Sequence, residues 1–437
     1  MSDKIRIAYN WIGPRGPIPN TEVPNILNLA SVAQSASTNS TRFWSDSIWH
    51  LLFCNNHGYD LSSTNFLSQH DKFIYPMALT WRLNFTTYFY QTSGILEYSD
   101  TSEQTLYLIR HGSGFILIED SAEAHIERNQ LEQMHSYFSI NNIPMNKVIY
   151  LTGCMNAQQI YDQWCLERLY HKPEDKMNIF SFPVSQDSLA IYFTVHNPQI
   201  PEYDTERAPE KLFLSWNRRF RPHRVAIGFG LDKLKLIDRS YISMGLTDPE
   251  NINMHITHSY NDYLLKYMQI TTEDKNNFVN KLPLVLDGET NINQMCQDFN
   301  DATRPYYQNS LVSIVSETNF DAPEVTLTEK SFKPIKEKHP FITVGAPGTL
   351  RALRDMGFKT FNTFWDEGYD DEVDSSERMK KILDLCKHIS TWNTHQIIDF
   401  RRRVKPILDH NYEALKTRYS VVVATKIRER ILEITNK

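Results

Sequence analysis

The sequence S-E-T-N-F-D-A-P-E-V-T-L-T-E-K-S-F-K at residues 316–333 is the stretch around which the chain is organised. An apolar run at residues 311–315 precedes it, is typical of a buried strand, and leads into Glu317. After a loop, Glu329 and Lys330 begin a segment with helical spacing. A strand, a loop and a helix in this order predict one unit of an open α/β sheet.

The residues at this helix start are suited to binding a nucleoside-diphosphate sugar. The carboxylate of Glu329 can hold the two ribose hydroxyls, and the Lys330 ammonium with the helix N-terminal amides can hold the diphosphate. Lys333, one turn later, is assigned to the same donor site. The same pattern also fits an ordinary helix cap with Thr326 or Thr328 as the N-cap residue, and such patterns are common. Spacing alone leaves both interpretations open.

Strands alternate with helices on both sides of this stretch. In the first half, residues 114–118 and 147–151 are apolar runs followed by helical spacing. In the second half, residues 212–216 form a strand, and Pro222 stands at the first position of the helix that follows. Two further apolar runs predict strands at residues 341–344 and 358–364. This alternation predicts parallel sheets.

A proline-rich stretch divides the chain. Residues 197–211 hold three prolines and many charges, which is typical of a linker. We therefore predict an α/β chain with two facing Rossmann-like domains. Residues 1–196 form the acceptor-side domain, residues 212–390 bind the nucleotide sugar, and residues 391–437 form C-terminal helices. An active site is expected in a cleft between the two domains.

The composition indicates an ordinary folded protein. Of the 437 residues, 41% are hydrophobic and 22% are charged, which excludes an intrinsically disordered chain. No apolar run approaches the roughly 20 residues that span a bilayer. The N-terminus leads directly into a strand and lacks a signal-peptide core. We expect a cytoplasmic protein without a membrane partner.

Metal and nucleic-acid signals are weak. The five cysteines are scattered without a C-x-x-C pair, and the histidines lack metal-ligand spacing, so we assign no metal. The acidic group at residues 370–372 fits a solvated turn better than a metal site. The net charge of −6 provides no general attraction to nucleic acid. The arginines at residues 401–403 are interpreted as a solvated helix face.

The strongest local signal is the basic segment N-R-R-F-R-P-H-R at residues 217–224. It lies between a predicted strand and a helix N-terminus, where an anion is favoured. Arginine side chains add bidentate contacts to phosphate. We therefore predict a phosphate site formed by Arg218, Arg219, Arg221 and His223, with a solvated basic loop as the alternative.

A second group of carboxylates follows the predicted strand at residues 114–118. Glu119, Asp120 and Glu123 can face a donor in the second half, and one of them can act as general base on an acceptor hydroxyl. Acidic residues at the start of a helix explain the same pattern. We predict Asp120 as the base, with Glu123 next.

Five sequence blocks in one order resemble GT-B glycosyltransferases. They are L-S-W-N-R-R-F-R-P-H-R, S-I-V-S-E-T-x-F, L-T-E-K-S-F-K-P, H-P-F-I-T-V-G-A-P-G-T-L-R and G-F-K-T-F. The blocks are similar to those of a fucosyltransferase-like group found in bacteria and tailed phages. The resemblance covers roughly residues 210–375 and is weaker in the first half, where the acceptor-domain pattern of that group is missing.

The resemblance implies roles for individual residues. Glu329 would hold the ribose, and Lys330 would reach the diphosphate. Arg218 or Arg219 would neutralise the leaving group, and Glu317 would lie near the transferred sugar as a catalytic residue. The family needs no obligatory metal, and the donor would be a UDP- or GDP-linked sugar.

The resemblance also suggests an acceptor. Relatives in tailed phages suggest a hydroxylated or hydroxymethylated cytosine in phage DNA, modified in the host cytoplasm, which requires a base flipped out of the duplex. Aromatic residues at 73–107 fit base stacking and core packing equally well. A glycan or a lipid-linked sugar is the alternative acceptor. An alternative of another class is a non-catalytic protein that binds a nucleotide sugar or a nucleic acid.

Overall fold

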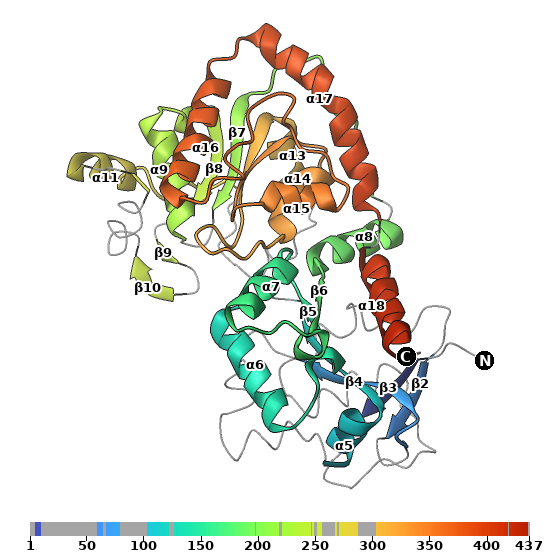
Figure 1. Cartoon of the computed structure of the whole chain (residues 1–437). Helices are drawn as coiled ribbons and strands as arrows, with labels where there is room; N and C mark the ends of the chain where they lie inside the picture. The colour runs from blue at the N-terminus through green and yellow to red at the C-terminus, as the bar shows by residue number, and fades with distance from the viewer. Residues whose placement is uncertain are drawn as a thin grey trace. The chain divides into compact units, whose positions relative to one another are not determined.

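The computed structural model divides the chain into two compact units, which are described separately (Figure 1). One unit contains residues 1–188 and 418–437, and the other contains residues 189–417. The structure describes residues 5–9, 59–63, 67–78, 103–121, 126–196, 198–217, 221–245, 247–248, 251–255, 267–268, 271–286, 303–417 and 419–435.

The first unit contains a six-stranded parallel sheet with the order β2-β1-β3-β4-β5-β6. Its strands are β1 (Ile5–Tyr9), β2 (Tyr59–Ser63), β3 (Lys72–Ala78), β4 (Ser113–Asp120), β5 (Val148–Thr152) and β6 (Asn178–Ser181). Because side chains alternate along a strand, β4 supplies Ile116 and Ile118 to one hydrophobic cluster and Phe115 and Leu117 to another.

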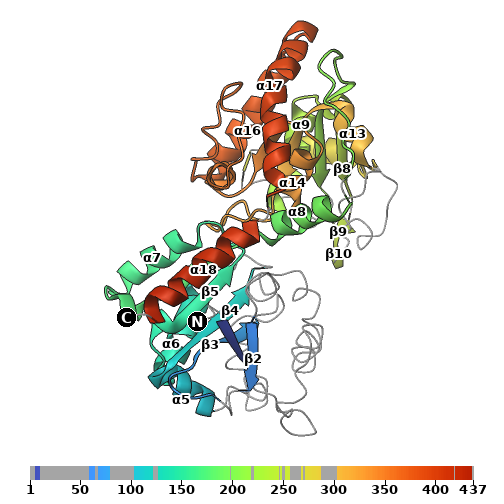
Figure 2. The ribbon, with the colours of Figure 1, turned by 90° about the vertical axis from the view of Figure 1, so that its right-hand side faces the viewer.

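Helices cover the two faces of this sheet. The first cluster includes side chains of α5 (Glu103–His111), α6 (Arg128–Ile140) and α7 (Ala157–Glu167). The second cluster includes Val423, Ile427 and Ile431 of α18 (Tyr419–Thr435), the C-terminal helix. Figure 2 shows α18 alongside β4 and β5. The end of the chain therefore completes the core of the first unit.

The second unit contains a four-stranded parallel sheet with the order β12-β11-β7-β8. Its strands are β7 (Lys211–Asn217), β8 (Ser240–Met244), β11 (Ser310–Ser316) and β12 (Phe341–Val344). Helix α9 (Pro222–Lys233) connects β7 to β8, and α14 (Glu329–Lys336) connects β11 to β12. The chain therefore winds outward in both directions from the neighbouring strands β7 and β11.

The remaining elements surround this second sheet. Helix α16 packs against α9, and α17 packs against α14 (Figure 1). These elements are α8 (Val184–His196), which spans the boundary of the two units, β9 (Thr247–Asp248), β10 (Asn251–His255), α11 (Thr272–Val279), α13 (Arg304–Gln308), α15 (Thr349–Asp355), α16 (Ser375–Ser390) and α17 (Thr394–Leu415).

The structure confirms the predicted α/β class with two parallel sheets and C-terminal helices. The facing arrangement of two domains around a cleft stays a prediction. The predicted boundaries need correction: residues 197–211 belong to the second unit, and the last helix belongs to the first. Charge and proline content alone suggested a free linker, but the described part of this segment packs on α17.

Arg401 and Arg402 of α17 contact that segment. Arg401 of α17 is buried, lies 4.7 Å from the centre of the Tyr203 ring and donates from Nε to the Asp204 backbone oxygen at 2.7 Å. Its neighbour Arg402 forms an ion pair with Glu206. The interpretation of residues 401–403 as a solvated face is therefore wrong for Arg401, whose charge is used inside the unit.

Candidate functional site

The carboxyl ends of β7 and β11 mark the point where the winding of the second sheet reverses. In open α/β sheets, ligands bind in the crevice at such a point. The pairing of Ser313 with Leu214 and of Ile314 with Ser215 continues to place Ser316 opposite Asn217, the last residues of the two strands. The loops that follow lead to α9 and α14, so both helices begin at this edge.

Direct contacts join the start of α9 to the end of β11. His223 Nε2 lies 2.9 Å from the Glu317 backbone oxygen. Arg224 Nη2 lies 3.5 Å from the Ser316 oxygen and 3.4 Å from the Glu317 oxygen. The structure therefore brings the start of α9 and the end of β11 together at one sheet edge.

His223 serves this junction as a neutral side chain. Its ring is buried and stacks on Phe320 with ring centres 5.4 Å apart. Burial, and then the adjacent Arg224 guanidinium, lowers the pKa of His223 to about 3. Because a carbonyl oxygen only accepts, the neutral ring donates from Nε2 to Glu317. The predicted role of His223 as a phosphate ligand is replaced by that of an internal anchor.

The start of α9 carries positive charge without a cap from the chain. Pro222 occupies the first turn as predicted, and the N-cap residue Arg221 is exposed and makes no side-chain cap. The first turn contains no acidic residue. Arg218 and Arg219 lie outside the described residues, so their phosphate contacts stay a prediction.

Glu317 is saturated by donors from its own chain. Its side chain is 1% exposed. Oε1 accepts from the Thr328 amide at 3.1 Å and from the Ser331 hydroxyl at 2.6 Å. Oε2 accepts from the Thr328 hydroxyl at 2.7 Å and from the Thr318 amide at 3.2 Å. These contacts make Glu317 an anchor for the following loop and leave no open position for a sugar.

Side chains of the same chain cap the start of α14. Thr328 is the N-cap residue, and its hydroxyl oxygen accepts from the Lys330 amide at 3.3 Å. The Thr328 amide donates to Glu317. Of the two N-cap candidates, the structure selects Thr328, and Glu317 supplies the second half of the cap. The Lys330 amide is thus bound by Thr328, and the role of this helix start in holding a diphosphate stays a prediction.

Glu329 and Lys330 form a partly exposed ion pair at this helix start. Lys330 Nζ lies 2.6 Å from Glu329 Oε1, and each side chain is 29% exposed. Burial alone would raise the pKa of Glu329, but the ammonium groups of Lys330 and Lys333 hold it below the usual value. Glu329 is thus an ionised carboxylate at neutral pH, beside two cations at the edge of the sheet.

Two buried polar atoms at the same edge lack partners among the described residues. Asn217 is 1% exposed and Ser316 is 2% exposed, and neither Asn217 Oδ1 nor Ser316 Oγ has a hydrogen-bond partner there. The other side of the Asn217 amide donates to the Ser215 hydroxyl at 2.7 Å. An unpartnered buried polar group costs about 1–3 kcal/mol. Each of these atoms can therefore take a further hydrogen-bond partner at this edge.

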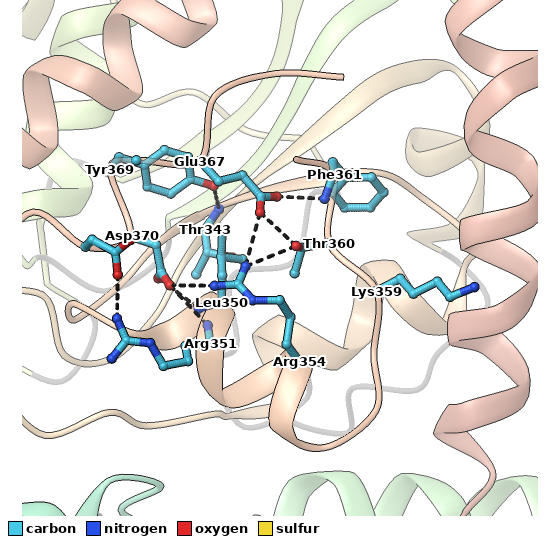
Figure 3. Close-up of polar contacts among 12 residues, drawn as sticks. Thr343, Leu350, Arg351, Arg354, Lys359, Thr360, Phe361, Glu367, Tyr369 and Asp370 are labelled. Atoms are coloured by element: carbon cyan, nitrogen blue, oxygen red, sulfur yellow. Dashed lines mark hydrogen bonds and ion pairs between the residues drawn. The ribbon is translucent and has the colours of Figure 1, made fainter. Parts of the chain in front are cut away.

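The loop after β12 is held by Asp370 (Figure 3). Asp370 is buried, and its carboxylate accepts from the amides of Leu350 at 2.8 Å and Arg351 at 3.0 Å, in the first turn of α15. Its backbone oxygen accepts from Gly348, whose φ of 86° requires the left-handed conformation. The interpretation of residues 370–372 as a solvated turn is wrong for Asp370, which caps a helix.

Glu367 lies beside this cap and shares an arginine with it (Figure 3). Arg354 Nη1 is 3.2 Å from Glu367 Oε2, and Nη2 is 3.7 Å from Asp370 Oδ2. Burial raises the pKa of both carboxyl groups. Glu367 also accepts from the Phe361 amide at 2.7 Å. Residues 358–364 therefore form turns around a carboxylate, which corrects the predicted strand.

The predicted base lies in the first unit. Asp120 ends β4 and is 3% exposed. Its Oδ2 accepts from the Tyr150 hydroxyl at 2.7 Å and lies 3.5 Å from the Gln130 amide nitrogen. Burial, and then Asp120, raises the pKa of Tyr150 well above the usual value, so the phenol donates at neutral pH. Glu123 and the Glu119 side chain lie outside the described residues.

Among the residues that the structure describes, no group of three His, Cys, Asp or Glu side chains is placed to hold a metal ion. No helix in the same residues is long and apolar enough to cross a bilayer.

Comparisons with known proteins give distant structural likenesses. No protein-family model and no curated protein matches the sequence. The α,α-trehalose 6-phosphate synthase of Burkholderia multivorans has a TM-score of 0.43 and 8% identity, over 85% of this chain and 73% of that chain. The UDP-forming α,α-trehalose-phosphate synthase of Burkholderia xenovorans has a TM-score of 0.40 and 10% identity, over 84% and 75%. Similarities this low assign neither a fold nor an activity to this chain.

Proposed function

We propose that the chain is a glycosyltransferase of the GT-B class whose nucleotide-sugar donor binds at the carboxyl edge of the second sheet. One observation supports this proposal: His223 and Arg224 at the start of α9 contact the backbone of Glu317, whose side chain caps the helix that begins with the Glu329–Lys330 pair. The donor is a UDP- or GDP-linked sugar, as the sequence resemblance suggests.

The charges at this edge suit the leaving group. Glycosyl transfer passes through an oxocarbenium-like state while negative charge grows on the departing diphosphate. Preorganised cations lower that barrier because they are already oriented when the charge develops. We assign this role to Lys330 and to Arg221 at the start of α9. Arg218 and Arg219 are proposed to add further positive charge. Glu329 binds the ribose hydroxyls, and Lys333 adds positive charge beside it.

The acceptor hydroxyl loses a proton during transfer, and we assign this step to Asp120. The Tyr150 hydroxyl fixes the carboxylate orientation through its 2.7 Å hydrogen bond. We predict that Asp120→Asn retains donor affinity within about twofold and lowers transfer at least about 100-fold, the range for a lost general base. Isothermal titration with the donor and product assays check the two parts. Full transfer activity in this variant would remove Asp120 from the mechanism.

The proposed acceptor is a hydroxylated or hydroxymethylated cytosine in DNA, with a glycan or lipid-linked sugar as the alternative. Mass spectrometry of modified and unmodified DNA, incubated with the chain and a panel of UDP- and GDP-sugars, tests this choice. A mass increase of one sugar on modified DNA alone supports the DNA acceptor. Transfer to oligosaccharides but not to DNA supports the alternative.

A non-catalytic binding protein remains a competing function. Slow release of UDP or GDP from a sugar donor without any acceptor separates the two, because an enzyme hydrolyses its donor at a low rate. The release should disappear in Lys330→Ala. Tight donor binding without release or transfer on any donor would show a binding protein.

A further inference from the structure

We propose that Glu317 and Thr328 are positioning residues that direct the Lys330 ammonium towards the donor diphosphate. This inference rests on the proposed function, and it gives Glu317 a role different from contact with the sugar. It follows from the hydrogen bonds that join Glu317, Thr328 and Lys330.

The Thr328 hydroxyl has one proton and two lone pairs. The proton is donated to Glu317 Oε2, 2.7 Å away, because a carboxylate surrounded by four donors accepts from each of them. Both lone pairs of Thr328 Oγ1 are then directed at Lys330, whose amide lies at 3.3 Å and whose Nζ lies at 3.2 Å. Glu317 thereby fixes the direction in which Thr328 accepts.

The same contacts leave one part of Lys330 available. An ammonium group has three N–H donors. Among the described residues, one points to Thr328 at 3.2 Å and one to Glu329 at 2.6 Å. With two donors held, the side chain has little rotational freedom, and the third donor of this partly exposed side chain is not taken by a described residue. A lysine held in this way loses less entropy on binding an anion than a free one does.

Glu317 is itself held firmly enough to act as the reference point. The Ser331 hydroxyl and the Thr318 amide bind its two oxygens at 2.6 Å and 3.2 Å. The backbone on either side is tied down too, since the Glu317 amide donates to Val344 at 2.9 Å. The position of Lys330 is thus set by the end of β11, across the whole loop that separates them.

The test measures binding of inorganic pyrophosphate, UDP and GDP to the full chain by isothermal titration. Thr328→Val keeps the side-chain shape and removes the hydroxyl, and we expect about 10-fold weaker binding of pyrophosphate, the worth of one charge-assisted contact. Thr328→Ser restores the hydroxyl and should bind within about twofold of the parent chain. Glu317→Gln should resemble Thr328→Val, because its amide donors oppose the Thr328 proton.

A matched control comes from the same loop. Thr326 Oγ1 accepts from Asn319 Nδ2 at 3.0 Å and is not bonded to Lys330. Thr326→Val therefore removes a loop hydroxyl and leaves the contacts of Thr328 with Glu317 and Lys330 in place. The pyrophosphate affinity of this variant should match that of the parent chain. Thermal unfolding of each variant confirms that the protein measured is folded.

Double variants with Lys330→Ala separate positioning from a merely structural role. If Thr328 acts through Lys330, Thr328→Val should change pyrophosphate affinity less than about twofold once Lys330 is absent. The same loss in both backgrounds would overturn the inference while the proposed function stands. If Thr328→Val does not fold, the same comparison is made with Glu317→Gln, alone and combined with Lys330→Ala. A parent chain that binds neither pyrophosphate nor UDP nor GDP would overturn the proposed function itself.

Discussion

Helices α9 and α14 both follow strands that end at the same sheet edge, yet their N-termini differ in how they are capped. At α14, Thr328 and Glu317 bind the first amides and bring a carboxylate to the positive end of the helix. At α9, the N-cap residue Arg221 makes no side-chain cap, and the first turn is without acidic residues. The positive end of the helix dipole is therefore offset by a carboxylate at α14, whereas the first turn of α9 supplies no such charge.

The start of α15 follows the pattern of α14. Asp370 binds two of its amides and supplies the negative charge. Among the described helix starts at this edge, α14 and α15 each bind a carboxylate of the chain, whereas α9 begins at Arg221 without an acidic residue in its first turn. In the proposed function, the donor diphosphate therefore binds at α9, and Lys330 contacts it from the start of α14.

The largest expected effect is on stability at α14. Glu317→Ala leaves the Thr328 and Ser331 donors without their acceptor, and we expect the free energy of unfolding to fall by about 3 kcal/mol. Chemical denaturation measures this. Arg221→Ala at the uncapped start should change the same quantity by no more than about 0.5 kcal/mol, as for other exposed residues. Equal losses in the two variants would contradict the contrast between the helix starts.

The next effect is on anion binding. Lys330→Ala removes the cation that α14 contributes, and we expect diphosphate binding to weaken by about 1.5–3 kcal/mol, the worth of a hydrogen bond to a charged group. Titration with UDP and GDP measures the change. Lys387 is an exposed lysine of α16, so Lys387→Ala is a matched control that should keep the parent affinity. Unchanged affinity in Lys330→Ala would remove Lys330 from the site.

Much of this edge was predictable from local sequence. The apolar runs predicted β7 and β11, and Pro222 predicted the start of α9, because strand and helix signals lie within a few residues of each other. The assignment of the basic segment and the Glu329–Lys330 pair to one site stays a prediction, and the structure shows that the strands before them, β7 and β11, are neighbours that end at the same edge.

What could not be predicted depends on contacts between distant residues. Glu317 and Thr328 are 11 positions apart, and nothing in the intervening loop indicates that one caps the helix of the other. His223 was grouped with the arginines because charge patterns do not reveal burial. The same limit explains Arg401, whose partners Tyr203 and Asp204 belong to the segment interpreted as a linker.

A smaller effect concerns Glu367, which lies beside the cap of α15, and it depends on pH. Burial raises the folded-state pKa of Glu367, so the ionised form destabilises the fold at neutral pH and protonation relieves this as pH falls. Glu367→Gln cannot gain from protonation. The parent chain should therefore gain stability relative to the variant as the pH falls from 7 to 5. Thermal unfolding of both proteins at the two pH values checks this, and a constant difference would contradict it.

The smallest effect is expected at α9 itself. Arg221 is exposed, so its attraction to a diphosphate is screened, and Arg221→Ala should weaken UDP or pyrophosphate binding by about 0.5 kcal/mol at physiological salt. The loss should grow at low ionic strength, because screening then extends over a longer distance. Arg221→Lys keeps the charge and should retain most of the affinity. Titrations of the three proteins at two salt concentrations measure both trends. If Arg221→Ala binds as tightly as the parent at low salt, the uncapped start of α9 does not attract the anion, and the contrast with α14 concerns stability alone.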